Sequence, residues 1–290
     1  MASSLPFDVL QRIVESLSES QMIDRATLSK LSLTCRSLLP MCRKHIFSAI
    51  SLQPRSFDND DPAKKCMVIN KNVDLLHLSI TNMELLTTSS PSIIDCVRSL
   101  HLELRSANVH DAGLVQLLDK FYFLEKLLLS NLYEPSSHVG DPQALHWAKF
   151  PSPLQAALVR IIKLQSVSHL TLCDIWMIPL ELILPFPNIS HLNVFSCGFS
   201  LPSPNHEWGS NTAPAQLKTF CVQAGFWSVF PLLETRYPNG SPVVDLSGLT
   251  LFSLELQSDL EEHPVGSFIE KLTSLHSLDI SSPGKGKHHL

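Results

Sequence analysis

Apolar residues in the first fifty positions recur at the three- and four-residue spacing of amphipathic helices. Three short helices are predicted. The first begins at Pro6, whose missing N–H costs nothing in a first turn, the second follows an N-cap at Asp24 and ends before Pro40, and the third starts near Met41. The stripes are Leu10, Ile13, Val14 and Leu17, then Leu28, Leu31, Cys35, Leu38 and Leu39, and last Cys42, Ile46, Ala49 and Ile50.

This helical segment carries apolar residues on more sides than three helices can bury against one another. A unit of fewer than about fifty residues buries too small a fraction of its surface to be stable alone without disulfides, a metal or another surface. The surplus of apolar residues therefore predicts that another surface docks on this segment. The covering surface is either a partner protein or the rest of this chain.

The segment resembles an F-box, the module that docks substrate receptors on the Skp-type adaptor of cullin ubiquitin ligases. The resemblance is carried by Leu5-Pro6-Phe7-Asp8-Val9-Leu10, Ile13, Leu17, Leu28, Leu31-Ser32, Cys35-Arg36 and Ile46-Phe47. It departs from the usual pattern at Asp8, Leu38 and Phe47, which keep an acidic or apolar type. The adaptor contacts that the resemblance implies are Leu5, Pro6, Leu10, Ile13, Leu28, Leu31 and Leu39.

Beyond residue 52, short units with the pattern apolar-x-x-apolar-x-apolar recur along the chain. Six of the eight intervals between their central residues fall within the 20 to 29 residues of leucine-rich repeats. The intervening positions are mostly polar, so each unit alternates like a strand with one buried face. The central residues are Ile50, Leu76, Leu100, Leu127, Leu170, Leu192, Phe220, Leu254 and Leu278.

These patterns predict an α/β fold in which a three-helix F-box is followed by an irregular leucine-rich-repeat-like solenoid. The expected domains are 1–52 for the F-box, 53–280 for the repeats and 281–290 for a disordered tail rich in Gly and Lys. One long interval contains a further helix with Ser152 as N-cap, Pro153 at its first position and Gln155 completing a capping box. Its expected apolar face is Leu154, Leu158, Ile161 and Ile162.

The order of these segments adds a second resemblance, which covers most of the chain. The F-box, the stretch Ser-Pro-Ser-Ile-Ile-Asp-Cys-Val-Arg-Ser-Leu-His-Leu at 90–102 and Ala-Ala-Leu-Val-Arg-Ile-Ile-Lys-Leu at 156–164 are similar to the F-box proteins expanded in mushroom-forming fungi. This likeness implies a substrate receptor of a ubiquitin ligase with an unknown protein substrate.

The amino-acid composition argues against two classes of binding partner. The formal net charge of -5 argues against nucleic acid and anionic membranes, which attract clustered Lys and Arg. No N-terminal apolar run follows a basic stretch, so no signal peptide is expected. The longest apolar region, Cys173 to Pro187, carries Asp174 and Glu181, so no membrane span is expected either. Seven scattered cysteines suit reduced thiols in the cytoplasm or nucleus.

Catalytic chemistry is not expected from the motifs. No nucleophile elbow, phosphate-binding glycine loop or dinucleotide motif occurs, so the chain is predicted to be no enzyme and to carry no cofactor. Cys42 and His45 form a C-x-x-H pair without a second half, so no metal site is expected. Four histidines recur beside the repeat leucines, as solvated strand residues or as a row that binds a partner: His101, His169, His191 and His276.

The sequence thus favours a substrate-recognition subunit of a cullin ligase, whose repeat surface after Val97 holds a protein substrate. Aromatic residues in the irregular intervals are candidate contacts, with burial as the alternative for each: Trp147, Trp208, Trp227 and Tyr237. An alternative is a repeat scaffold with a helical cap, unconnected to ubiquitin. A third possibility is a hydrolase assembled from Ser or Cys and His residues that folding brings together.

Overall fold

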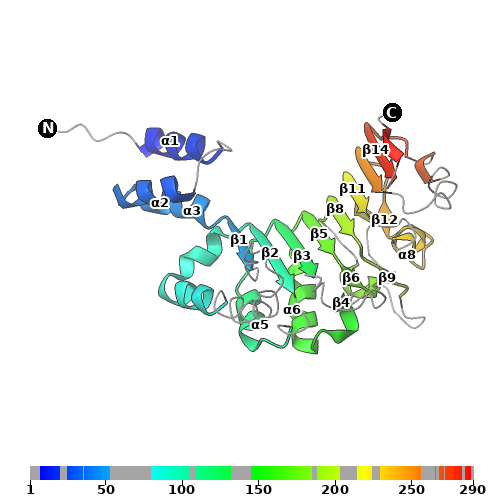
Figure 1. The fold of residues 1–290 in the computed structure, drawn as a ribbon, viewed down its shortest axis with the longest axis horizontal. Helices are drawn as coiled ribbons and strands as arrows, with labels where there is room; N and C mark the ends of the chain where they lie inside the picture. The colour runs from blue at the N-terminus through cyan, green and yellow to red at the C-terminus, as the bar shows by residue number, and fades with distance from the viewer. Residues whose placement is uncertain are drawn as a thin grey trace, which may run out of the picture.

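The structure is a computed structural model that describes residues 7–19, 25–34, 36–52, 80–104, 109–131, 145–184, 188–202, 214–223, 229–255, 265, 268–270, 272–282 and 285–288. The chain is a mixed α/β protein built on a large, mostly parallel β-sheet (Figure 1). Helices at the N-terminus lead into one edge of the sheet, and the C-terminal strands lie at the other edge.

The N-terminal segment contains α1 (Phe7–Glu19), α2 (Arg25–Thr34) and α3 (Leu38–Ile46). The three helices lie where the sequence predicts helices, but the second boundary is wrong. Leu38 and Leu39 begin α3 and do not end α2, and Pro40 lies in the first turn of α3. A proline there removes no helical hydrogen bond, so it does not mark a helix end. The predicted N-cap Asp24 lies outside the described residues.

In the described part of the chain, the main sheet has nine strands in the order β1-β2-β3-β5-β8-β11-β13-β14-β15. All neighbours are parallel except β14 and β15. The strands are β1 (Ala49–Leu52), β2 (Ser99–Leu104), β3 (Lys126–Asn131), β5 (His169–Cys173), β8 (His191–Phe195), β11 (Thr219–Gln223), β13 (Leu251–Glu255), β14 (Ser277–Ser282) and β15 (Lys285–His288).

The strand register aligns the predicted repeat units. Leu100, Leu127, Leu170, Leu192 and Phe220 pair in one buried row across five strands. Each residue of the row is at most 2% exposed. The units predicted by apolar spacing are therefore successive strands of one sheet.

The unit in β13 was predicted two residues out of phase. Phe252, not Leu254, pairs with Phe220 and belongs to the buried row. Leu249 and Leu254 complete the unit, whereas Leu251 is partly exposed. Both Leu249/Phe252/Leu254 and Leu251/Leu254/Leu256 fit the apolar spacing, so the pattern alone did not fix the phase. The weaker unit around Leu76 lies outside the described residues, and β1 pairs directly with β2.

A repeated backbone hydrogen bond joins successive strands where they begin. The carbonyl of Glu125 accepts the N–H groups of Ser168 and His169 at 2.9 and 3.1 Å, and the carbonyl of Ser168 accepts those of Ser190 and His191 at 3.0 Å. The same two-donor arrangement recurs at the carbonyls of Ser48, Arg98, Ser190, Lys218 and Thr250. Each unit therefore holds the next one in the same way.

The apolar face of the sheet is covered by helices and loops. These include the helical residues 80–89, η1 (Pro91–Cys96), α5 (Ala112–Leu118) and α6 (Ser152–Ile162), which contribute to one continuous core with the strands. In Figure 1, α5 and α6 lie on one side of β2, β3 and β5. The sheet is therefore packed on one side.

The α6 helix has the predicted apolar face, since Leu154, Leu158 and Ile161 are fully buried. Its predicted N-cap is wrong: Pro151 is the N-cap residue, and it makes no side-chain cap. The Gln155 amide instead donates to the carbonyls of Trp147 and Phe150 at 3.2 and 2.8 Å, because the chain before the helix turns back within its reach.

Short elements fill the connections between the main strands. Non-glycine residues with positive φ follow two of the main strands at equivalent positions, Asp174 after β5 and Ser196 after β8, so the chain leaves both strands through the same kind of turn. The short elements are β4 (Leu145–His146), η2 (Trp147–Lys149), β6 (Ile175–Trp176), β7 (Ile178–Pro179), α7 (Leu180–Ile183), β9 (Phe199–Ser200), β10 (Ala215–Gln216), α8 (Phe230–Glu234) and β12 (Val244–Asp245).

The C-terminal segment differs from the predicted disordered tail. Residues Lys285–His288 form β15, which pairs antiparallel with β14. Strand pairing uses backbone groups alone, so the polar, glycine-containing composition does not prevent it. Within the described residues, none of the helices has the length and apolar character that crossing a membrane requires.

Candidate functional site

The N-terminal helices have a small hydrophobic core of their own. It consists of Val14, Leu28, Leu38 and Cys42, and it forms a cluster separate from the core under the sheet. The main contacts of α1 are with α2 and α3, and α3 in turn contacts η1. The three helices (from here on, the helical head) therefore pack chiefly on one another and adjoin the sheet through α3.

The outer side of α1 exposes large apolar side chains. Val9 and Ile13, which are four residues apart and so lie on one side of the helix, are 37% and 41% exposed. Leu10 is partly buried against the core of the head, as is Leu17. Val9 and Ile13 are thus apolar side chains of α1 that the head itself leaves uncovered.

The predicted adaptor contacts fall into three groups in the structure. Ile13 is exposed, Leu28 is only 5% exposed within the core of the head, and Leu10, Leu31 and Leu39 are partly buried. Leu28 thus holds the helices together in this structure. Leu5 and Pro6 lie outside the described residues. Val9 was not among the predicted contacts, although its spacing from Ile13 could have indicated it.

The packing between α1 and α3 leaves a cavity of about 230 Å³. Its walls combine apolar and charged side chains, namely Gln11, Val14, Glu15, Pro40, Met41, Lys44 and His45. Gln11 also donates to Glu15 at 2.7 Å along α1. The head is therefore incompletely packed on the side where α1 meets α3.

The second candidate surface is the polar face of the main sheet. At one register position, Lys126, His169, His191 and Thr219 stand side by side on β3, β5, β8 and β11. Lys218 immediately precedes Thr219 at the start of β11. We call Lys126, His169, His191 and Lys218 the basic row.

The two imidazoles at the centre of the basic row are stacked. The ring centroids of His169 and His191 are 4.0 Å apart, and the ring planes meet at 12°. Nδ1 of His169 lies 2.9 Å from Oγ of Ser168, and Nδ1 of His191 lies 2.7 Å from Oγ1 of Thr219. Each ring is thereby held by its Nδ1 atom, while no described residue bonds its Nε2 atom.

The pKa of each of these histidines is lowered. For His169 the causes are burial, then the neighbouring His191 and Lys126, against which the Glu125 carboxylate acts in the opposite direction. For His191 the causes are burial, then Lys218 and Lys126. Burial and nearby positive charge both disfavour the imidazolium form. The pair is therefore mostly neutral near pH 7.

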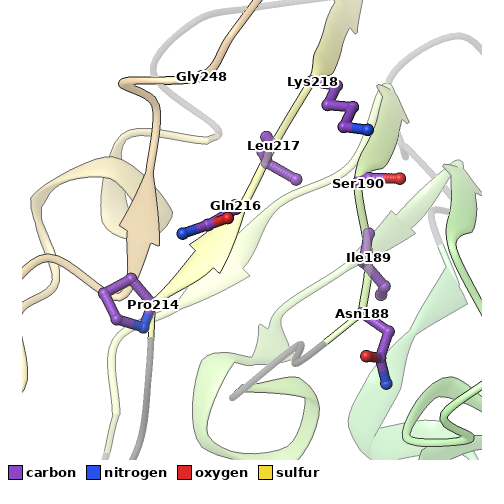
Figure 2. A pocket seen from close by; sticks show the side chains of 8 residues that line it. All are labelled: Asn188, Ile189, Ser190, Pro214, Gln216, Leu217, Lys218 and Gly248. Atoms are coloured by element: carbon purple, nitrogen blue, oxygen red, sulfur yellow. The ribbon is translucent and has the colours of Figure 1, made fainter.

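A cavity of about 390 Å³ lies at one end of the basic row (Figure 2). It is formed where the chain enters β8 and β11, with Ile189 and Leu217 as its apolar part and Asn188, Ser190, Pro214, Gln216, Lys218 and Gly248 as the rest of its lining. Figure 2 shows Lys218 reaching from its strand toward the β8 side, above Ser190. Lys218 therefore belongs both to the cavity and to the basic row.

The other predicted histidines lie elsewhere on the sheet. His101 lies on β2, two residues beyond Ser99, which is the residue in register with Lys126, and its Nε2 lies 3.2 Å from Oγ of Ser130. His276 precedes β14 near the far edge and lies 2.8 Å from the carbonyl of Ser274. The four histidines thus do not form one row: His169 and His191 form a stacked pair, and His101 and His276 lie apart from it.

The aromatic residues predicted as surface contacts are buried where the structure describes them. Trp147 and Tyr237 are 2% and 4% exposed, so neither offers a ring to a partner. Trp208 and Trp227 lie outside the described residues. Among the described aromatic residues, exposed rings are instead found at Tyr122, Phe123 and Trp176. Tyr122 and Phe123 precede β3 and lie under the guanidinium groups of Arg160 and Arg98, respectively.

A serine hydroxyl and the cysteine thiols are the groups that could act as nucleophiles. The Ser168 hydroxyl contacts His169, but neither residue lines the cavities described above. The described cysteines are free, and burial raises the pKa of Cys197 to about 12 and that of Cys173 to about 11. In the described part of the chain, no group of three or more His, Cys, Asp or Glu side chains could hold a metal ion.

Comparison of the chain with known protein families, with curated proteins and with solved structures finds no match in any of the three. The function is therefore inferred from the chain's own residues.

Proposed function

We propose that the chain is the substrate-recognition subunit of an SCF-type cullin ubiquitin ligase. The helical head would be an F-box that docks on a Skp-type adaptor, and the sheet would be a leucine-rich-repeat-like solenoid that holds a protein substrate. The chain would do no bond chemistry itself. It would accelerate ubiquitin transfer by holding a substrate lysine near the charged conjugating enzyme, which raises the effective concentration of the reactants.

The observation that carries the docking proposal is the exposed pair Val9 and Ile13 on α1. In the described part of the head, the buried core has four residues, which is very small for three helices, and such units gain stability when a partner covers the remaining apolar surface. A helix that places residues four apart in a groove is a common way to form that contact. A helical partner surface would complete the packing of the head.

The solenoid proposal is supported by the sheet. Parallel sheets are usually covered on both faces, whereas here one face carries polar residues such as Lys126 and Lys218, both exposed. Equivalent turns at Asp174 and Ser196 and the repeated two-donor hydrogen bonds are features of stacked units that contact their neighbours. A polar face of this kind is available for a protein partner.

Capture of the chain by a tagged Skp-type adaptor tests the docking proposal. We expect the wild-type chain to be captured and Ile13→Glu to be lost, because the substitution places a charge in an apolar contact. Leu33→Glu is the matched control: Leu33 is 84% exposed on α2 and is not a predicted contact, so capture should persist. Circular dichroism should show both variants folded. Failure to capture the wild type, or equal capture of both variants, would overturn the proposal.

One contact favours a second candidate function. In this alternative, the chain is a repeat scaffold unconnected to ubiquitin, and the helical head is its cap. The helix α3 touches η1 and leads directly into β1 at the edge of the sheet, where a cap would lie. This reading predicts no adaptor capture at all. It also predicts that Leu10→Asp with Leu31→Asp lowers stability without changing any partner, since both side chains pack on the core of the head.

We also propose a cytoplasmic or nuclear location, where cullin ligases act. The described cysteines are free, which suits a reducing compartment.

A further inference from the structure

The basic row stands out against the charge of the whole chain. The chain has a formal net charge of -5, yet two histidines and a lysine lie side by side on three neighbouring strands, and a second lysine directly precedes the fourth. Lys126 and Lys218 are exposed, and neither ammonium group has a partner in the described part of the chain. Local positive potential therefore concentrates at this part of the polar face.

The carboxylate that acts on His169, that of Glu125, already has a partner. Glu125 acts on His169, but its Oε1 lies 3.4 Å from Nε of Arg98, so much of its charge is balanced on the β2 side. Arg98 also lies over the Phe123 ring, which fixes the guanidinium at that place. The charges of Lys126 and Lys218 are thus left without a balancing group, and an anionic partner is favoured.

We propose that the basic row and the cavity beside it bind a carboxylate-rich segment of a protein. This inference rests on the proposed function in one respect, namely that the segment belongs to the substrate. Its glutamate or aspartate side chains would meet Lys126, the His169–His191 pair and Lys218, and one carboxylate would enter the cavity.

The spacing of the row fits a short extended peptide. From β3 to β11 there are three strand-to-strand steps, or about 14 Å at the usual spacing of about 4.8 Å. An extended chain covers that distance in about four or five residues. Carboxylates on alternate residues would therefore reach both lysines, and the Asn188, Ser190 and Gln216 side chains of the cavity offer further polar contacts.

The histidine pair gives the binding a pH dependence with a definite sign. In the free chain, burial, the neighbouring imidazole and Lys126 and Lys218 lower the pKa of both rings. Carboxylates placed against the rings would raise these pKa values, because an opposite charge favours the imidazolium. Protons would then be taken up on binding, so affinity should increase as the pH falls from about 7.5 to about 6.

Fluorescence anisotropy with a labelled octapeptide of alternating glutamate and serine tests the proposal on the full chain. We expect binding that weakens with salt and a loss of about tenfold when glutamine replaces glutamate in the peptide. Lys126→Glu with Lys218→Glu should weaken binding by about tenfold. His169→Gln with His191→Gln should remove most of the increase at low pH.

Lys149→Glu with Lys163→Glu is the matched control. These lysines are exposed on η2 and just after α6, away from the row, and the double substitution changes the net charge by the same amount. We expect its affinity to stay within about twofold of the wild type. Equal losses in both double variants, or no binding by the wild type, would overturn the proposal.

The peptide experiment needs no adaptor, so its result is independent of the docking proposal. A chain that binds the glutamate peptide but is not captured by a Skp-type adaptor would retain the acidic-segment site and lose the ligase function. A chain that is captured by the adaptor but does not bind the peptide would keep the ligase function and lose the acidic-segment site.

Discussion

Two glycines of the described chain differ sharply in the space around them. A Cβ at Gly198 would lie 2.7 Å from Cε3 of Trp176, whereas a Cβ at Gly248 would meet nothing within 4 Å. We expect Gly198→Ala to lower the free energy of unfolding by about 1–3 kcal/mol, because the indole must move. Gly248→Ala should stay within about 0.5 kcal/mol of the wild type. Urea unfolding measures both, and equal values would contradict the close packing of Trp176.

The thiols predict a second residue-scale result. Burial raises the pKa of Cys197 to about 12 and of Cys173 to about 11, and only the thiolate reacts with iodoacetamide. At about pH 8 we expect Cys197 to stay unmodified in the folded chain and to react once urea unfolds it. Peptide mass spectrometry provides the measurement, and the half-buried Cys96 serves as the internal comparison. Rapid labelling of Cys197 before unfolding would show that the turn after β8 opens readily.

At the scale of elements, the helical head depends on very few side chains. Leu28→Ala removes one of four buried residues and should cost about 2–5 kcal/mol of the stability of the head. Leu33→Ala removes an exposed side chain from the same helix and should cost less than about 0.5 kcal/mol. Thermal unfolding followed by circular dichroism measures both. A head that tolerates Leu28→Ala would draw its stability from the contact of α3 with η1 instead.

The sequence predicts the existence of the elements better than their boundaries. Leucine spacing located three helices and the strands, because burial of one face is encoded in the period of the apolar residues. The boundary between α2 and α3 was missed because Pro40 fits a first turn as well as a helix end. The phase of β13 was missed because Leu251, Phe252 and Leu254 offer two apolar alternations.

The candidate sites could be predicted only in part. Histidines beside the repeat leucines were visible in the sequence, but the stacking of His169 on His191 depends on the register between β5 and β8, which no local pattern contains. The burial of Trp147 and Tyr237 likewise depends on distant segments. Exposure of Ile13 on α1 could be inferred from excess apolar surface, yet which side of the helix stays open is a property of the folded head.

At the scale of the whole molecule, the repeated hydrogen bond between units has an energetic consequence. Each carbonyl such as that of Glu125 or Ser168 binds only the next unit, so a strand interacts chiefly with its two neighbours. In a stack of this kind, stability is close to a sum of unit and neighbour contributions, and the end units are the weakest. The core under the sheet is continuous, but disturbances should spread through it strand by strand.

Hydrogen exchange followed by mass spectrometry can measure this spread. Leu170→Ala creates a cavity at a fully buried position in β5, so we expect amide exchange to accelerate most in β3, β5 and β8 and least in β14. Leu278→Ala in β14 is the reciprocal variant and should accelerate exchange first in β13 and β14. The two variants should thus differ in which strands exchange faster, and not only in how much the exchange accelerates. Uniform acceleration along the chain in both variants would mean that the sheet unfolds as one cooperative unit, and the description of the molecule as stacked, neighbour-coupled units would fail.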